Sequence, residues 1–165
     1  MDLAIDIAAP WPPACDWAEL AFRCADVAAT VAPELAHQRL SADLLLADDA
    51  EVRALNRQWR AKDKPTNVLS FPMLHRATLL TLSIDGPEEM LGDLALALET
   101  CTREAAGKGI ALADHAAHLI VHGLLHLAGH DHETSAEDAE AMEALEIKAL
   151  ALMGIADPYG DADLA

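Results

Sequence analysis

The chain has 165 residues, the size of about one domain, and we expect residues 1–165 to form a single domain with its own core. Hydrophobic residues make up 53% and charged residues 24%, a balance that excludes wholesale disorder. The 28 acidic and 11 basic residues give a net charge of −17, which argues against diffuse binding to nucleic acid. The chain has no long apolar run and an acidic start, so we expect no membrane span, no secretory signal and a cytoplasmic location.

In chain order, the apolar pattern alternates between strand-like and helix-like segments. Short alternating or continuous apolar runs favour strands at 3–7, 41–47, 68–71 and 91–98. Helical spacing favours five helices, at 15–30, 50–59, 100–108, 114–128 and 135–153. The segment 75–89 has little pattern and is expected to be the most mobile stretch. This order predicts the α+β class: one small, mixed, four-stranded sheet covered by about five helices.

Six of the eight histidines cluster in one short stretch of the predicted helix 114–128 and just beyond it. His122 and His126 are four residues apart, so on a helix both rings leave the same face. Gly129 is placed to end that helix, because glycine adopts a left-handed conformation easily. The chain can then return either His130 or His132 toward the pair. Three imidazoles suit zinc, copper or nickel and leave one position open, so the spacing predicts a metal site.

The spacing also matches that of metzincin peptidases, with one departure. The residue after the first histidine is a glutamate in those enzymes and acts as the general base, whereas here it is Gly123. We therefore predict a zincin-like metal helix that lacks the peptidase base. Asp131 can serve either as a partner of a ligand or as a base. His118 and His115, one and two turns before the pair, are interpreted as surface or packing residues.

A second group of candidates lies in a basic stretch, since five of the 11 basic residues fall between positions 53 and 64. Arg53 and Arg57 share one helix face, which is typical of a solvated flank. Arg60 opens a polar loop, where its guanidinium can match two phosphate oxygens. Next to a metal, such a group stabilises charge on a phosphoryl transition state, which favours phosphodiester over peptide cleavage. The neighbouring Trp59 can stack on a base, but its helical register predicts a core position.

Three segments resemble the hallmark sequences of a known family. They are HGLLHLAGHDH at 122–132, LNRQWRAKDKPTNVLSFP at 55–72 and LGDL at 91–94. Together they resemble the YbeY family, bacterial single-strand-specific endoribonucleases that are also called rRNA maturation factors. The order of predicted elements agrees with this family over nearly the whole chain.

The resemblance implies that His122, His126 and His132 bind one catalytic metal ion, Zn²⁺, with other divalent transition metals such as Ni²⁺ as alternatives. It also implies that Arg60 is the functional arginine that engages RNA phosphate. The implied role is maturation of 16S ribosomal RNA at its 3′ end and ribosome quality control in the cytoplasm. The implied partners are ribosomal RNA and the small ribosomal subunit, with no membrane. Arg57, Lys62 and Lys64 are our further candidates for RNA contacts.

Two other classes of function remain open at this point. A non-catalytic, metal-stabilised ribosome assembly factor would hold its metal in a closed site, for example with His130 as a fourth ligand. A zinc hydrolase of peptides would need a carboxylate base beside the metal, and Gly123 counts against it.

Overall fold

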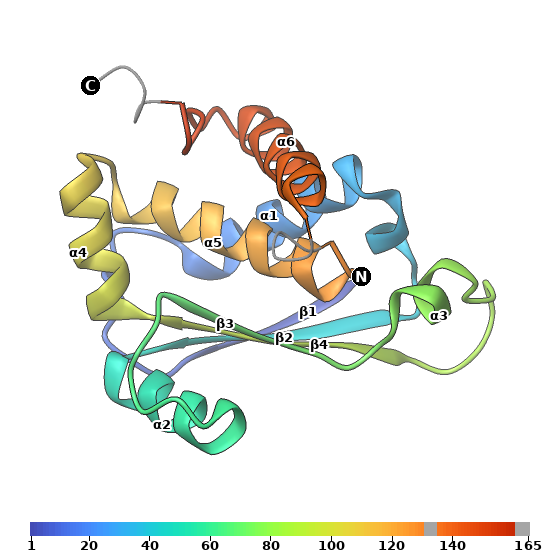
Figure 1. Cartoon of the computed structure of the whole chain (residues 1–165), viewed down its shortest axis with the longest axis horizontal. Helices are drawn as coiled ribbons and strands as arrows, with labels where there is room; N and C mark the ends of the chain where they lie inside the picture. The colour runs from blue at the N-terminus through green and yellow to red at the C-terminus, as the bar shows by residue number, and fades with distance from the viewer. Residues whose placement is uncertain (131–134, 161–165) are drawn as a thin grey trace.

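A computed structural model of the chain describes residues 1–130 and 135–160. Four strands form one sheet, and their order across it is β1-β2-β4-β3 (Figure 1). The first three of these run parallel, and β3 pairs antiparallel with β4 at the edge of the sheet. The strands are β1 (Asp2–Ile7), β2 (Leu40–Ala47), β3 (Val68–Pro72) and β4 (Glu89–Ala97). The predicted mixed, four-stranded sheet is therefore confirmed.

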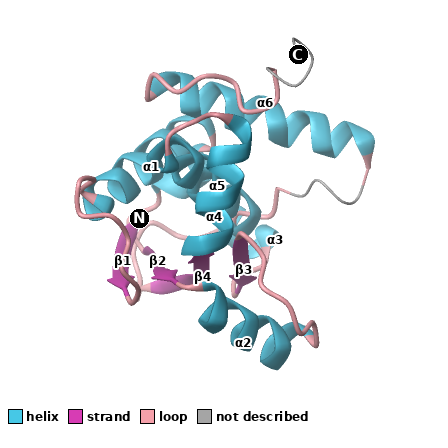
Figure 2. Ribbon diagram, turned by 90° about the vertical axis from the view of Figure 1, so that its left-hand side faces the viewer, coloured by secondary structure: helices cyan, strands magenta, loops and turns pink. Residues whose placement is uncertain are grey.

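The helices cover the two faces of the sheet unequally (Figure 2). One face carries α1 (Trp17–Val31), α4 (Leu98–Lys108), α5 (Leu112–Leu127) and α6 (Ala136–Leu152). The other face carries α2 (Asp49–Arg60) alone (Figures 1 and 2). These five helices match the five predicted ones, with ends that differ by no more than a few residues.

Two short elements were not predicted. A 3-10 turn at Pro33–Ala36 follows α1, and α3 (Arg76–Leu80) forms inside the segment that has little sequence pattern. Leu79 explains α3, because this side chain is buried in the main core although most of the helix is exposed. One buried leucine in five residues is too little for a periodic signal.

The main core lies between the sheet and α5. Leu44 and Leu46 of β2 and Leu94 and Leu96 of β4 point to this face, as the alternation of strand side chains requires. A smaller apolar cluster lies under α2, around Val52, with Ala47, Leu69, Ala95 and Ala97 from the sheet and its ends. The α2 face is therefore only partly covered, and the α5 face carries most of the burial.

The position of α2 corrects the prediction for Trp59. Val52 is fully buried and Leu55 is half-buried, but Trp59 one turn later is 66% exposed. Since the described residues place no other helix on this face, the apolar side of the last turn of α2 meets no second layer there. The core assignment of Trp59 was therefore wrong.

Within residues 1–130 and 135–160, no single helix is long and apolar enough to cross a membrane. Helices α4 and α5 together have the length and composition of a membrane span, but the pair is bent by 114°.

Candidate active site

Helix α5 carries the histidine pair. Its N-terminal half is buried against α1 and the sheet, and His122 and His126 are both half-buried on the same side. The helix ends at Leu127, and Gly129 follows with a φ of 94°, as the sequence predicted. The His130 N–H donates to the Leu125 carbonyl at 3.0 Å, which closes the helix end.

Each histidine of the pair is held through its Nδ1 atom by a different element. His122 Nδ1 lies 2.7 Å from Glu146 Oε1 on α6. His126 Nδ1 lies 2.8 Å from Ser70 Oγ on β3. Metal-binding histidines commonly use the second ring nitrogen in this way, because the hydrogen bond fixes the ring and its tautomer. Both rings would therefore ligate a metal through Nε2.

The proposed third ligand, His132, lies outside the described residues, and so does Asp131. The structure does describe His130, whose Nε2 lies 3.0 Å from Glu34 Oε2. The same carboxylate oxygen accepts from Arg76 Nη1 at 2.8 Å, and this nitrogen also donates to the Ala128 carbonyl at 2.7 Å. His130 is thus paired with Glu34, and Arg76 links this carboxylate to the turn after α5.

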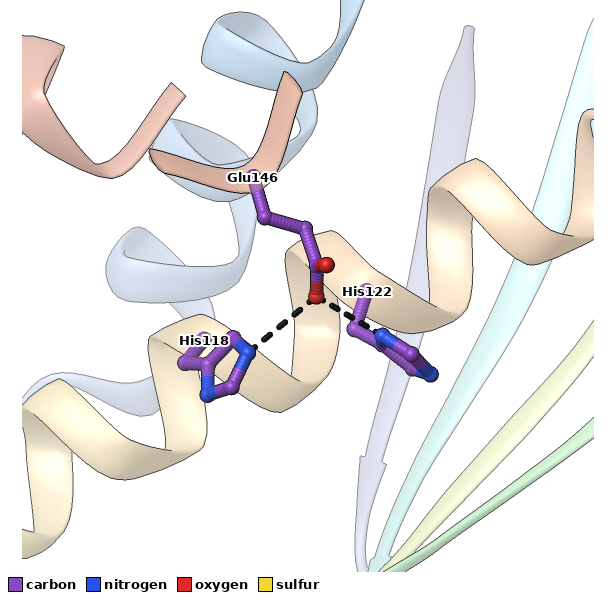
Figure 3. A group of neighbouring side chains, drawn as sticks. All are labelled: His118, His122 and Glu146. Atoms are coloured by element: carbon purple, nitrogen blue, oxygen red, sulfur yellow. Dashed lines mark hydrogen bonds and ion pairs between the residues drawn. The ribbon is translucent and has the colours of Figure 1, made fainter. Parts of the chain in front are cut away.

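Glu146 gathers a buried polar cluster beside the pair (Figure 3). Its Oε1 atom lies 3.1 Å from His118 Nε2, and the Tyr159 hydroxyl lies 3.0 Å from its Oε2 atom. His118, His122 and Glu146 offer ligand atoms that all lie within 4.8 Å of one another, close enough to hold a metal ion. Of the two predicted alternatives for His118, surface or packing, the structure shows packing.

The charge of Glu146 is stabilised inside the fold. Burial raises the pKa of this carboxyl, but hydrogen bonds from His118 and His122 outweigh burial and bring the pKa to about 2. A buried carboxylate that accepts several hydrogen bonds behaves in this way. His115 is also buried and pairs with Glu104 at 2.8 Å; burial, the largest effect, lowers the pKa of His115.

Arg60 is the last residue of α2 and reaches the strand that holds His126. Its Nη2 atom donates to the Ser70 carbonyl, and its guanidinium lies over the Phe71 ring, 5.3 Å from the ring centre. The backbone of Ser70 therefore holds Arg60, while the hydroxyl of Ser70 holds His126. The structure therefore brings Arg60 and His126 into contact with the same residue.

The remaining basic candidates surround Arg60 on the surface. Arg57, Lys62 and Lys64 are exposed, and the carbonyl of Lys64 accepts from Asn56 Nδ2 at 2.8 Å, which folds the loop back onto α2. Arg53 instead pairs with Asp63 at 2.8 Å. In the part of the chain that the structure describes, none of the three candidates forms a salt bridge.

A groove of about 510 Å³ opens on the face of the sheet beside α2. Its bed holds Asp43 and Asp93, and burial, followed by the neighbouring Asp43 carboxyl, raises the pKa of Asp93. The groove is largely apolar elsewhere, and these acids make its bed unsuitable for phosphate groups. Its other lining residues include Leu55, Trp59, Phe71 and Met73.

Sequence reasoning missed three residues of this site: Ser70, Glu146 and Tyr159. Glu146 lies among many acids on an acidic helix, and nothing in its spacing sets it apart. Ser70 falls inside a quoted motif, but only the fold shows that its hydroxyl meets His126. Tyr159 is the chain's single tyrosine, and this fact alone does not indicate which residues it contacts.

Comparison with known proteins identifies the family to which the chain is similar. The sequence model of the family described as endoribonuclease YbeY matches residues 16–154. A protein named endoribonuclease YbeY from Novosphingobium aromaticivorans is 61% identical over 162 residues, which cover 98% of this chain and 97% of that protein. The protein of the same name from Erythrobacter litoralis is 59% identical over 161 residues, covering 98% and 99% of the two chains.

The solution structure of TM1509 from Thermotoga maritima is similar in fold, with a TM-score of 0.57 and 20% sequence identity. The match covers 92% of this chain and 91% of that chain. The family match, which spans most of the sequence, and the high identity to full-length relatives lead to one conclusion. This chain belongs to the endoribonuclease YbeY family.

Proposed function

We propose that the protein is a metal-dependent endoribonuclease that cleaves single-stranded RNA and acts in maturation of the 3′ end of 16S ribosomal RNA and in ribosome quality control. The main structural support is that Ser70 contacts both His126 and Arg60. These contacts support the proposal because they hold the proposed metal ligand and the proposed phosphate-binding group at one point of the sheet edge. The relatives' name supplies the reaction class. The proposed setting is the cytoplasm, with ribosomal RNA and the small subunit as partners.

The proposed metal ligands are His122, His126 and His132. The first two fit a cation because each has its Nδ1 atom in a hydrogen bond, so that ligation falls to Nε2. Three imidazoles favour zinc, and nickel also suits them. A bound ion of this kind supplies Lewis-acid polarisation of a phosphoryl oxygen and acidifies a water molecule.

Arg60 would bind the scissile or an adjacent phosphate. Its contacts with Ser70 and Phe71 hold the guanidinium against β3. A planar guanidinium offers paired donors to two phosphate oxygens and stabilises charge that grows on them. Arg57, Lys62 and Lys64 would attract the neighbouring phosphates, and the exposed Trp59 ring is available to stack on an unpaired base.

The two rival functions are less well supported by the same geometry. A closed, structural metal site with His130 as a fourth ligand conflicts with the hydrogen bond between His130 and Glu34. A peptidase base at position 123 conflicts with packing, because a Cβ atom added to Gly123 would lie 2.6 Å from Leu94 Cδ2. A side chain at this position would therefore point at Leu94 of the sheet.

The test is cleavage of a purified single-stranded RNA by the wild type and by the variants His126→Ala, Arg60→Ala and Arg57→Ala. His126→Ala should lose both metal and activity. Arg60→Ala should keep its metal and lose about 10²- to 10³-fold in rate, as when one transition-state donor is removed. Arg57→Ala is the matched control, an exposed arginine on the same helix, and should lose much less.

Two further outcomes make the test decisive. If the wild type and all variants cut alike, a contaminating nuclease is responsible and the proposal fails. If only Arg60→Ala matches the wild type, the arginine has no part in the reaction. The affinity for single-stranded RNA should fall with salt by a slope of only about −2 to −3, because few phosphates are contacted.

A further inference from the structure

We infer that Glu146 and Tyr159 are positioning residues that set the tautomer and direction of His122, and that His118 belongs to this hydrogen-bond network and does not ligate the metal. This inference rests on the proposed function, since it takes His122 as a metal ligand. It goes further by assigning roles to three residues of the buried cluster.

The first support is the hydrogen-bond inventory around Glu146. An ionised carboxylate can only accept hydrogen bonds, so every polar neighbour must donate to it. His122 must then carry its proton on Nδ1, 2.7 Å from Oε1, and His118 must carry its proton on Nε2, 3.1 Å from the same atom. The Tyr159 hydroxyl donates to Oε2 at 3.0 Å. Three donors thus share one carboxylate that is only 1% exposed.

The second support is which ring nitrogen of each histidine keeps a lone pair that can ligate a metal. With its proton on Nδ1, neutral His122 has its lone pair on Nε2, the ring nitrogen that points away from Glu146 in Figure 3. With its proton on Nε2, neutral His118 has its lone pair on Nδ1. That atom is buried and has no hydrogen-bond partner among the described residues. His118 could ligate a cation through Nε2, the nitrogen in the cluster with His122 and Glu146, only by giving up its bond to Glu146.

The third support is distance. Two ligands at about 2.0–2.1 Å from a tetrahedral zinc ion lie roughly 3.3 Å apart. His122 Nδ1 and Glu146 Oε1 are 2.7 Å apart, which is the length of a charge-assisted hydrogen bond. The contact between these two residues is therefore better described as a hydrogen bond than as two ligands of one ion.

Tyr159 encloses the cluster from the segment that follows α6. Besides its bonds to Glu146, its hydroxyl lies 3.1 Å from His118 Nε2, and its ring packs edge-to-face on His118 with 5.3 Å between ring centres. Contacts on two sides hold His118 in place and keep water from Glu146. Rigid support of this kind keeps a ligand within the narrow range that metal binding needs.

Two measurements on the full-length protein test the inference. In the metal-free wild type, long-range proton–nitrogen spectra of the imidazoles should show His122 with its proton on Nδ1 and His118 with its proton on Nε2. The opposite tautomer at His122 would overturn the inference. This measurement needs no substitution, so a folding defect cannot confuse it.

The second measurement is zinc affinity, obtained by competition with a chelator. Glu146→Gln should bind zinc about 10- to 100-fold more weakly than the wild type, the range seen when such partners are removed. Glu140→Gln, a change of an exposed glutamate on the same helix, is the matched control and should bind as the wild type does. His118→Gln keeps an N–H donor for Glu146 and should lose less affinity than His122→Gln.

The outcomes separate the inference from the proposed function. If His122→Gln binds zinc as the wild type does, the metal site itself is wrong. If His122→Gln loses zinc but Glu146→Gln does not, only the positioning role fails. If His118→Gln loses as much as His122→Gln while its thermal unfolding is unchanged, His118 is a ligand and the inference is overturned.

Discussion

The contact between α5 and β4 offers a sharp test of how the metal helix is seated. Gly123 lies between the two histidines of the pair and packs directly on the sheet. A Cβ atom at this position would lie 2.6 Å from Leu94 Cδ2 and 3.1 Å from Leu94 Cδ1. Carbon atoms in contact normally stay about 3.5–4.0 Å apart, so the helix or the leucine must move in Gly123→Ala.

Two opposing effects set the magnitude. Overpacking a tight core destabilises a protein by about 1–3 kcal/mol. Replacing glycine by alanine inside a helix stabilises the folded state by up to about 1 kcal/mol, because alanine has the higher helix propensity. We therefore expect Gly123→Ala to lower the free energy of unfolding by about 1 kcal/mol. In a Leu94→Ala background, the leucine atoms are gone and a cavity takes their place, so the same change should become stabilising by about 1 kcal/mol.

Urea unfolding of the wild type, both single variants and the double variant measures this change of sign. The coupling between the two positions should be about 2 kcal/mol, within the range known for residues in contact. Gly107→Ala on α4 is the control, because nothing lies within 4 Å of its added Cβ atom, and it should not be destabilising. Additive effects at positions 123 and 94 would refute the close-packing interpretation.

Three other consequences can be measured separately. Trp59→Ala should leave the melting temperature almost unchanged, because the ring is 66% exposed, and should weaken binding to single-stranded RNA by about 1–3 kcal/mol in a fluorescence titration. Folding lowers the pKa of Glu146 from 4.5 to about 2, so the ionised carboxylate stabilises the folded protein fully above pH 4.5. This contribution is lost as the pH falls toward 2. The free energy of unfolding of the wild type should therefore fall more steeply over this pH range than that of Glu146→Gln. Gly129→Ala should destabilise by more than about 1 kcal/mol in thermal unfolding, because its φ is 94° and its Cβ would lie 2.7 Å from Arg76 Cβ.

The parts of the fold that follow local rules could be predicted from the sequence. Strand alternation and helical spacing gave all four strands and the five longer helices, since each has enough apolar residues to set a period. The position of Gly129 correctly predicted where helix α5 ends. The pairing of His122 and His126 on one face needed only helix geometry.

The residues that the sequence did not predict correctly depend on which helices and strands contact one another in the fold. Trp59 has the register of a core residue, but no second layer covers the end of α2. Glu146 is one acid among many on α6, and only the packing of α6 against α5 shows that it faces His122. The choice between His130 and His132 turned on the family resemblance, and the bond between His130 and Glu34 became visible only in the fold.

The edge strand β3 explains how a strongly acidic protein can present a site for RNA. Because β3 is the last strand of the sheet, one side of its backbone has no strand neighbour among the described residues. The Ser70 carbonyl accepts from Arg60 of α2, and the Ser70 hydroxyl meets His126 of α5. Helices on opposite faces thus bring His126, a proposed metal ligand, and the Arg60 guanidinium to one rim. The net charge of −17 is a property of the whole surface, whereas a phosphate at this rim responds mainly to charges within about 8 Å.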